Sequence, residues 1–528
     1  MLRDFVIALS LSNLCFIRAW DRLPVGARAY FADYPNPAAG ALIDMLLLAL
    51  LFFNGATLAR RQDNQRLLNA ARLFFVLILM VPLNGLRLRY PQLILNTTYL
   101  PFGPVTLFAI LLLPLALVLY ALKRFYLLVV HGAAVWMLLL SPFVCFSLYS
   151  AIKSMVETHR FESAVHAEKS AEGSTSVVRP SSTRIVWIIF DELDERLVFV
   201  ARPAMIKLPE LDRLRDEAFF ATHAYSPARL TQSSLPALLT GRLVASVEPT
   251  GPSELSLRMA DVPGELPWSQ QPNIFSEARK YGVRTGLAGW HHPYCWVIGK
   301  DITTCADLRQ ELDAKQTLAR KMSDEFLDLL SSVPLAYRFL TQTLEFRLHA
   351  VKQSLVLEDA KRLLADKDLG LVFLHFPVPH PPGIFDRATG QFALRGKQSY
   401  LDNLVLVDRT FSELRRAMET TGTWDNTTVI VSSDHWWRAE GWSHNPLWKA
   451  EEAGTVAPRP DHRVPFIIKL AEQREPLSYD SEFNTVLTKD LVLALLRGDL
   501  KSAQNVASWL DQHRSFGDSP YNVGDPQL

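Results

Sequence analysis

Val429-Ile430-Val431-Ser432-Ser433-Asp434-His435 is an apolar run that ends directly in a carboxylate and an imidazole. A second run of the same form, Ile185-Val186-Trp187-Ile188-Ile189-Phe190, ends in Asp191 and Glu192. An open α/β sheet gathers its ligands at the carboxyl ends of its strands. The two runs therefore predict two strands of one α/β domain, with acidic groups and an imidazole at one edge of the sheet.

A hydroxyl group joins this set in the stretch Thr231-Gln232-Ser233-Ser234-Leu235-Pro236-Ala237-Leu238-Leu239-Thr240-Gly241-Arg242. Thr231 stands there in a turn rich in Ser, Thr and Pro, just before an apolar run. Carboxylates, an imidazole and one hydroxyl are suited to binding a divalent metal and to activating a nucleophile.

The remaining soluble part alternates predicted strands and helices. Residues 369–375 form an apolar run, and residues 401–420 carry apolar side chains at helical spacing. A polar turn at residues 423–427 then leads into the strand before Asp434. This order of strand, long helix, turn and strand is typical of a mostly parallel α/β sheet.

This set of residues resembles the active site of the alkaline phosphatase superfamily. Within that superfamily it most resembles the membrane-anchored phosphoethanolamine and phosphoglycerol transferases, to which the sulfatases are related. The resemblance covers roughly residues 184–470, in several separated pieces. Sulfatases carry a cysteine that matures to formylglycine, followed by Leu-Thr-Gly-Arg. Here Leu239-Thr240-Gly241-Arg242 is present, but Thr231 stands at the cysteine position. The transferases place Thr there, with Ser and Pro where this chain has Ser234 and Pro236, so the resemblance implies a threonine nucleophile.

The resemblance also implies the metal ligands. Glu192 is the expected ligand after the first strand, and Asp191 adds a second oxygen; the alternative is that both acids cap the next helix. Asp434 and His435 match the family's Ser-Asp-His, although this chain continues with Trp436-Trp437 where the family usually has Gly.

The Thr231 oxygen completes this ligand set of two oxygens and one nitrogen. Such a set suits Zn²⁺ in tetrahedral geometry, and the metal would favour the threonine alkoxide. Mn²⁺ remains the alternative, because carboxylate-rich sites accept several ions.

Four further histidines are expected at the substrate. The transferases carry two histidines after a strand, and His375 and His380 have a similar spacing. His380 is expected to hold the phosphoryl oxygens or to bind a second metal, or else simply to be fixed in a proline-rich loop. His444 and His462 compete as a further imidazole at the substrate. His291 and His292 are expected at the surface.

Composition separates the chain into two parts. It has 528 residues, of which 49% are hydrophobic, and 55 basic against 54 acidic side chains, which gives no sign of a nucleic-acid binder. The hydrophobic excess lies in the first third of the chain. Five stretches are apolar enough to be membrane spans: Phe5–Trp20, Ala38–Phe53, Leu73–Leu86, Val105–Leu122 and Tyr126–Tyr149.

Basic residues in the short loops predict the orientation of these spans. Arg60, Arg61, Arg66 and Arg72 lie between the second and third spans, which indicates a cytoplasmic loop. Five spans then place the remainder outside, in the periplasm of a bacterial inner-membrane protein. The predicted domains are a transmembrane domain (1–150), a juxtamembrane helix with linker (151–183) and a catalytic domain (184–528). Four spans with a cytoplasmic domain are the alternative.

Two cysteines in the soluble part, Cys295 and Cys305, are separated by a short polar segment. In an oxidising periplasm they would close a small disulfide loop, and two free thiols are the alternative.

The function implied by the resemblance is a two-step transfer. Thr231 takes a phosphoethanolamine or phosphoglycerol group from a phospholipid donor in the membrane, and a glycan or lipid acceptor then receives it. Two alternatives remain: a hydrolase of phosphodiesters or sulfate esters that uses water as the acceptor, and a non-catalytic member that assists envelope assembly.

Overall fold

The computed structural model describes residues 1–25, 27, 30–31, 34–61, 65–89, 120, 124–125, 127–171, 183–333, 337–393, 398–439, 448–456 and 462–514. The chain divides into two compact units. The first, helical unit consists of Met1–Val25, Pro35–Arg160 and Lys315–Leu344. The second unit, called the catalytic unit because it contains the residues expected to be catalytic, consists of Gly26–Tyr34, Phe161–Ala314 and Glu345–Leu528. The units therefore cross the predicted domains at two places, because a short early segment joins the second unit and part of the expected catalytic domain joins the first.

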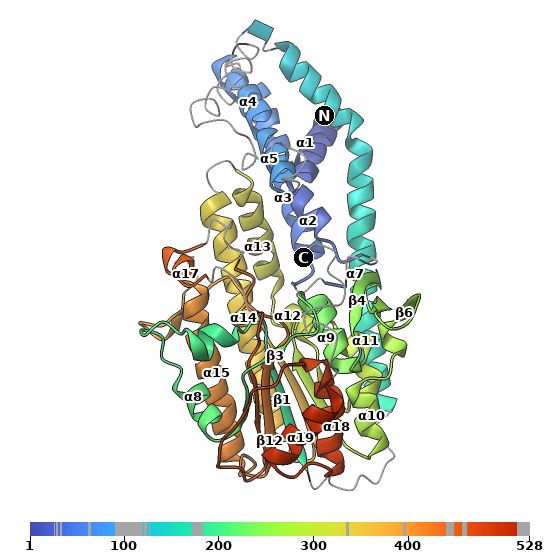
Figure 1. Ribbon diagram of the computed structural model, residues 1–528. Coiled ribbons are helices and arrows are strands. Elements are labelled where there is room, and N and C mark those ends of the chain that lie inside the picture. Colours follow the sequence, from blue (N-terminus) through green and yellow to red (C-terminus); the bar gives the residue numbers. More distant parts are fainter. Residues whose placement is uncertain are drawn as a thin grey trace. The chain divides into compact units, whose positions relative to one another are not determined.

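A sheet of eight described strands forms the centre of the catalytic unit (Figure 1). Its order is β14 (Leu477–Tyr479), β2 (Phe219–Ala221), β13 (Phe466–Lys469), β12 (Thr427–Ser433), β1 (Arg184–Phe190), β9 (Leu371–Phe376), β7 (Thr285–Gly289) and β8 (Thr304–Ala306). The strands from β12 to β8 run parallel, whereas β13 is antiparallel to both of its neighbours. The predicted α/β fold with a mostly parallel sheet is confirmed.

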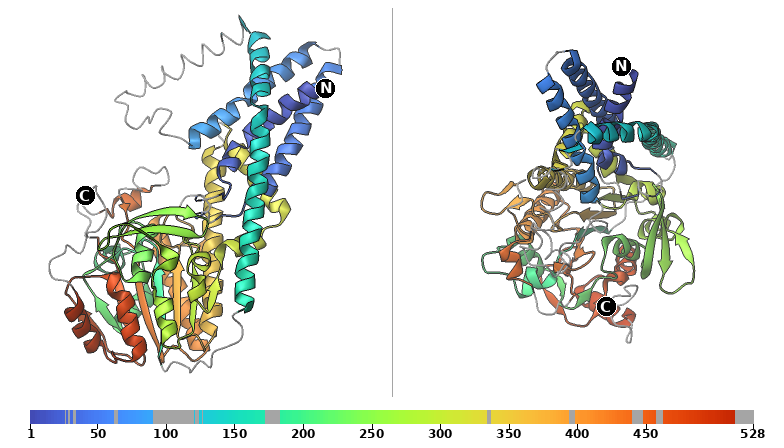
Figure 2. Two further views of the ribbon diagram at one scale, coloured as in Figure 1. Left: turned by 90° about the vertical axis from the view of Figure 1, so that its right-hand side faces the viewer. Right: turned by 90° about the horizontal axis from the view of Figure 1, so that it is seen from above.

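Side chains of β1 alternate between two apolar cores, one on each face of the sheet. Ile185, Trp187 and Ile189 join the core that includes α9 (Thr231–Thr240), α10 (Ile274–Lys280), α18 (Thr488–Arg497) and α19 (Ala503–His513). Val186 and Ile188 join the core that includes α8 (Pro209–Asp216), α14 (Tyr337–Ala365) and α15 (Tyr400–Thr420). Helices therefore cover both faces of the sheet (Figure 1 and Figure 2), which explains why β1 is apolar from Ile185 to Phe190.

Shorter elements surround this sheet. The pairs are β3 (Ala224–Tyr225) with β15 (Phe483–Asn484) and β10 (Phe385–Asp386) with β11 (Gln391–Phe392). A three-stranded sheet consists of β4 (Val244–Gly251), β5 (Glu254–Met259) and β6 (Glu265–Pro267). The short helices are α11 (Tyr294–Val297), α12 (Leu308–Ala314) and α17 (Ala450–Ala453).

The helical unit contains α1 (Leu2–Cys15), α2 (Ile17–Asp21), α3 (Ala38–Arg61), α4 (Gln65–Ile78), α5 (Met80–Arg89), the first part of α7 (Ser141–Ala171) and α13 (Leu318–Ser331). Within the described residues, Ala38–Arg61 and Gln65–Leu86 are long and apolar enough to cross a membrane. The bent pair Leu127–Leu139 and Ser141–Arg160 makes a third candidate if it is one span.

The described residues therefore show two or three of the five expected spans. The first expected span is divided at Phe16 between α1 and α2, which leaves each piece shorter than a crossing requires. The fourth expected span lies almost wholly outside the described residues. The expected juxtamembrane helix is continuous with the last span, since α7 runs without a break from Ser141 to Ala171. The expected linker falls outside the described residues, apart from Thr183.

Helix α13 packs closely against α3, although it lies far along the chain. A Cβ atom at Gly40 of α3 would lie 2.7 Å from the backbone carbonyl of Lys321 in α13. Only glycine permits this approach. The contact places the Ala38 end of α3 beside α13, while the Arg61 end lies about 30 Å farther along the helix axis.

An ion-pair network ties α13 to the end of the first helices. Arg22 Nη2 lies 2.7 Å from Glu325 Oε2 and 3.1 Å from Asp328 Oδ2, and Arg18 Nη2 lies 3.0 Å from Asp328 Oδ1. The Glu325 and Asp328 side chains are only 6% and 7% exposed. Carboxylates at this depth depend on their cationic partners.

Replacing Arg22 by methionine should therefore destabilise the helical unit, by about 3 kcal/mol. Thermal unfolding of the full chain in detergent measures the effect. The control is Arg60→Met, which removes an ion pair with Asp4 whose arginine is 51% exposed and should cost less than about 1 kcal/mol. Equal losses for the two variants would contradict the role of the buried network.

Candidate active site

Four parallel strands end at one edge of the sheet, and the candidate site residues follow them. Phe190 at the end of β1 pairs with Ser433 at the end of β12 and with Phe376 at the end of β9. Gly289 at the end of β7 pairs with His375 of β9. The register therefore brings the residues after all four strands to the same place, as expected for a ligand site in an open α/β sheet.

Three carboxylates are buried together at this edge: Asp191, Glu192 and Asp434 are each 0% exposed. Asp434 Oδ1 accepts hydrogen bonds from the backbone N–H groups of Glu192 at 3.1 Å and His435 at 2.9 Å. Asp191 Oδ1 and Asp434 Oδ2 are buried without a hydrogen-bond donor among the described residues. Buried carboxylate oxygens of this kind require a positive partner.

Glu192 adopts a backbone conformation that is rare for a side chain other than glycine, with φ of 66°. Such a conformation costs on the order of 1–3 kcal/mol and persists where the surroundings fix it. The Tyr400 hydroxyl donates to the Glu192 carbonyl at 2.8 Å. The backbone N–H and Nε of Arg438 donate to Glu192 Oε1 at 2.8 Å and 3.2 Å. These bonds hold the Glu192 carboxylate toward the site.

The two tryptophans that replace the family's glycine have structural roles. Trp437 is 3% exposed and stacks on the Tyr400 ring, with 4.6 Å between the ring centroids. Because Tyr400 holds the Glu192 carbonyl, Trp437 supports a ligand of the candidate site. Trp436 stacks on His462, with 4.2 Å between centroids. The departure from the family pattern therefore leaves the expected ligands in place.

Thr231 is the first residue of α9, not part of a turn before it. Its hydroxyl donates to Asp191 Oδ2 at 3.3 Å and lies 3.1 Å from His435 Nε2. The hydroxyl therefore joins the groups that follow β1 and β12. Thr231 also stands at a helix N-terminus, where backbone N–H groups and the helix dipole favour negative charge.

The hydrogen bonds of two histidines define their tautomers. His435 Nδ1 lies 2.9 Å from the Trp436 carbonyl and His380 Nδ1 lies 2.6 Å from the Pro381 carbonyl. A carbonyl only accepts, so each Nδ1 carries the proton and each neutral ring has its lone pair at Nε2. His435 Nε2 faces Asp191 and His380 Nε2 faces Glu192, at 3.6 and 3.8 Å from their carboxylate oxygens. A carbonyl partner on the opposite nitrogen is typical of metal-ligating histidines.

The residues fit a divalent metal site. Two groups have ligand atoms within 4.8 Å of one another: Asp191 with Glu192 and His380, and Asp191 with Asp434 and His435. The two groups share Asp191. Buried carboxylate oxygens without donors, together with imidazole lone pairs, form a donor set that a cation would complete.

Burial and mutual charge shift the pKa values of these groups. Burial, with the charges of Asp434 and Glu192, raises the pKa of Asp191 well above its usual range. Burial also opposes ionisation of Glu192, but Arg438 and His380 hold its pKa below the ordinary value. Burial lowers the pKa of His435 well below its usual range, and that of His380 less. Both imidazoles are therefore neutral, the form that binds metals.

The other histidines expected at the substrate lie in different surroundings. His375 is fully buried in β9, where burial lowers its pKa to about 3. Its Nε2 lies 3.8 Å from Asp191 Oδ2, so it adjoins the carboxylates and not a surface that a substrate approaches. His462 packs on Trp436 and belongs to neither metal-binding group. His444 lies outside the described residues.

The loop after β7 was missed as part of the site, and the expectation that His292 lies at the surface is wrong. His292 is 4% exposed, and its Nε2 lies 3.3 Å from the Thr231 carbonyl. Tyr294 OH lies 2.9 Å from His375 Nδ1. Gly289 makes room for this bond, because a Cβ there would lie 2.9 Å from the Tyr294 ring. The end of β7, next to β9, was the signal that could have identified this loop.

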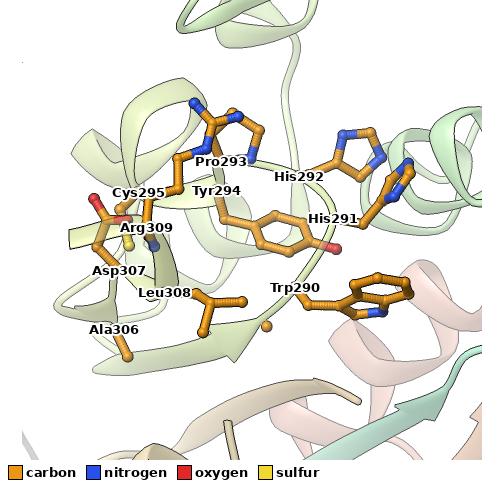
Figure 3. Close-up of a pocket in the computed structure, with 11 residues that line it drawn as sticks. Trp290, His291, His292, Pro293, Tyr294, Cys295, Ala306, Asp307, Leu308 and Arg309 are labelled. Carbon is orange, nitrogen blue, oxygen red and sulfur yellow. Dashed lines mark hydrogen bonds between the residues drawn. The ribbon is translucent and has the colours of Figure 1, made fainter. Parts of the chain in front are cut away.

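Figure 3 shows this loop around a small pocket, with the hydroxyl end of Tyr294 directed toward the side that holds Trp290 and His291. A disulfide joins Cys295 of the loop to Cys305 of β8. Of the two alternatives for Cys295 and Cys305, the disulfide is therefore the one present. It fixes the segment that carries His292 and Tyr294 to the edge of the sheet.

The family model described as Sulfatase matches residues 183–496, more than half of the chain. The chain belongs to the sulfatase family. This family lies within the alkaline phosphatase superfamily, whose members are enzymes that use divalent metals. The match includes β1, Thr231 and the Asp434-His435 pair, so the candidate site lies inside the sulfatase-family region. No curated protein matches the chain significantly.

Solved structures similar to this sulfatase-family chain include three of different activity. The lipoteichoic acid synthase LtaP from Listeria monocytogenes has 12% identity, a TM-score of 0.38 and coverage of 63% of this chain and 77% of its own. A phosphonate monoester hydrolase from Silicibacter pomeroyi has 15% identity, a TM-score of 0.37 and coverage of 60% and 73%. BT1596, a 2-O GAG sulfatase, has 16% identity, a TM-score of 0.38 and coverage of 60% and 70%. Likeness at this level carries no argument about the substrate.

Asp434→Asn should separate metal binding from folding. Asparagine keeps an oxygen that accepts from the N–H groups of Glu192 and His435, but it replaces the charged Oδ2 by an amide. We expect the metal content of the purified protein to fall on the order of tenfold or more, with little change in melting temperature. Elemental analysis measures the content. His462→Ala is the control that should keep its metal, and full metal in Asp434→Asn would remove Asp434 from the ligand set.

Proposed function

We propose that the protein transfers a phosphoethanolamine or phosphoglycerol group from a membrane phospholipid to a glycan or lipid acceptor. The transfer passes through a covalent adduct on Thr231. The observation that carries this proposal is the position of the Thr231 hydroxyl, 3.3 Å from Asp191 Oδ2 and 3.1 Å from His435 Nε2 at the first turn of α9.

The identity of the nucleophile favours a phosphoryl transferase over a formylglycine sulfatase. Formylglycine requires a cysteine, and threonine stands at the corresponding position. The chain has four cysteines. Cys295 and Cys305 are joined in a disulfide, and Cys15 and Cys145 lie in the helical unit. A hydroxyl nucleophile among carboxylates and imidazoles suits attack on phosphorus.

The proposed transfer has two steps. Thr231 Oγ1 forms a bond to the lipid phosphorus, and the bond from phosphorus to the diacylglycerol oxygen breaks. The proton of the threonine hydroxyl passes by way of Asp191 Oδ2 to the departing diacylglycerol oxygen. In the second step an acceptor hydroxyl oxygen forms its bond to phosphorus, the bond to Thr231 Oγ1 breaks, and the proton of the acceptor hydroxyl passes to the threonine oxygen.

The residues of the site divide this work. The carboxylates and imidazoles would hold a divalent cation, which would lower the pKa of a nearby hydroxyl and stabilise charge on a phosphoryl oxygen. Asp191 and His435 orient the Thr231 oxygen. The first N–H groups of α9 favour an anionic phosphoryl group beside it. His380 is 20% exposed in its side chain, so it is the imidazole of the set that a substrate can reach.

The helical unit supports a membrane lipid as the donor. Helix α3 is long and apolar enough to cross a membrane, and Arg60 and Arg61 stand at its C-terminal end. Because basic clusters beside a span face the cytoplasm, we infer that this end of α3 is cytoplasmic. With the five spans expected from the sequence, this orientation assigns the catalytic unit to the outer face of a bacterial inner membrane.

The tryptic peptide that contains Thr231 tests the proposal directly. Cleavage after Arg229 and Arg242 releases residues 230–242. Full-length protein is incubated with vesicles of phosphatidylethanolamine or phosphatidylglycerol, without an acceptor. We expect a mass increment of the lipid head group on Thr231, localised by fragmentation, because the adduct then has no alcohol to receive it.

Variants and acceptors decide between the alternatives. Thr231→Ala should lose the adduct completely, Thr231→Ser should keep part of it, and Ser233→Ala should leave it unchanged. Release of a free head-group phosphate in place of an accumulated adduct would indicate the hydrolase. The absence of both, in protein that retains its metal, would indicate a non-catalytic member of the family.

A further inference from the structure

A tyrosine from the segment after the first helices lies inside the catalytic unit, beside a histidine that contacts the proposed nucleophile. Tyr30 is 0% exposed and belongs to the apolar core that contains α9. Its hydroxyl lies 3.1 Å from His292 Nδ1. The neighbouring Phe31 ring packs on His291 and His292, with centroids 5.2 and 6.0 Å apart. Two aromatic rings therefore hold this segment against the loop that follows β7.

The hydrogen bonds of His292 fix the direction of a relay. Its Nε2 lies 3.3 Å from the Thr231 carbonyl, which only accepts, so Nε2 carries the proton. His292 is buried, and its other ring nitrogen, Nδ1, lies 3.1 Å from the Tyr30 hydroxyl. In this tautomer Nδ1 bears the lone pair and accepts from the Tyr30 hydroxyl. The chain of donors runs from Tyr30 through His292 to the backbone of the nucleophile.

This relay acts on the orientation of Thr231. The Thr231 side chain must keep its oxygen within reach of Asp191 and His435, at 3.3 and 3.1 Å. A hydrogen bond from His292 to the Thr231 carbonyl fixes the backbone of the same residue. Without the Tyr30 hydroxyl, His292 Nδ1 would be buried without a donor, and the other tautomer would no longer donate to Thr231.

We propose that Tyr30 is a positioning residue for the nucleophile, acting through His292 on the Thr231 backbone. The segment between the first helices and α3 thus completes the active site of the catalytic unit. The inference rests on Thr231 as the nucleophile of the proposed function. It holds equally for an alcohol or for water as the acceptor.

Tyr30→Phe in the full-length membrane protein tests the relay, because it removes one oxygen and keeps the ring in the core. The probe is bis(p-nitrophenyl) phosphate, a phosphodiester that a transferase and a hydrolase would both cleave. We expect kcat to fall about tenfold, with KM, metal content and melting temperature close to those of the wild type. The matched control is Tyr479→Phe, which removes a hydroxyl bonded to Asp511 at 2.9 Å and should leave kcat unchanged.

Replacing the histidine separates positioning from packing. His292→Gln keeps an amide N–H near the place of Nε2 and should retain more activity than His292→Leu, which has no donor. In the His292→Leu background, Tyr30→Phe should have no further effect, because the relay is already broken. Equal kcat in Tyr30→Phe and wild type, or additive losses in the double variant, would overturn the inference.

A spectroscopic readout separates failure of the relay from failure of the proposed function. Nitrogen NMR shifts of histidine-labelled full-length protein report the tautomer of His292, assigned by the loss of its signal in His292→Gln. We expect Nε2–H in the wild type and a mixture of tautomers in Tyr30→Phe. The same tautomer in both proteins would refute the relay whether or not Thr231 forms an adduct. A wild type without adduct or hydrolysis, but with the expected tautomers, would refute only the proposed function.

Discussion

Mutual repulsion among Asp191, Glu192 and Asp434 is the constraint on which the site depends. All three are fully buried at one edge of the sheet, where the low dielectric makes the repulsion of like charges stronger than in water. The guanidinium of Arg438 lies 3.2 Å from Glu192 and pairs with that carboxylate. Asp191 and Asp434 each keep one oxygen that receives no hydrogen bond from the described residues. A bound divalent cation would offset this repulsion, and the sheet places the carboxylates where they can hold it.

The sheet makes this arrangement possible because parallel strands end together. β1 and β12 pair through their last residues, so four polar residues that follow them meet without any long loop. The backbone of Glu192 is strained in this arrangement, with φ of 66°. Hydrogen bonds from Tyr400 and Arg438 hold Glu192 in this conformation, and Trp437 stacks on the Tyr400 ring. Trp437, the second residue after His435, therefore supports the conformation of Glu192 through Tyr400.

Much of the site could be predicted because it is local in sequence. Apolar runs that end in Asp-Glu and Asp-His identify their strands and the edge at which they meet, and the Thr231 stretch carries a recognisable pattern. The sequence could not show that His375 is buried behind Asp191, because strand residues of either face look alike in a fully apolar run. His292 follows a strand and was open to the same argument as Asp434. Tyr30 carries no local signal, since only the folded chain brings it to His292.

The compact units of the structure differ from the predicted division at residue 150 for a related reason. Hydropathy distinguishes apolar stretches from stretches of mixed polarity. It could not assign two segments whose composition fits either compact unit. Gly26–Tyr34 joins the catalytic unit and Lys315–Leu344 joins the helical unit, so the chain passes between units five times. An anchor attached by a single linker could be removed without effect on the nucleophile. Here the segment after the first helices brings Tyr30 into contact with His292, which contacts Thr231. Helix α13 forms an ion pair with Arg22 through Glu325. In the proposed transferase, the segment between the first helices and α3 is thus part of the architecture that aligns the nucleophile.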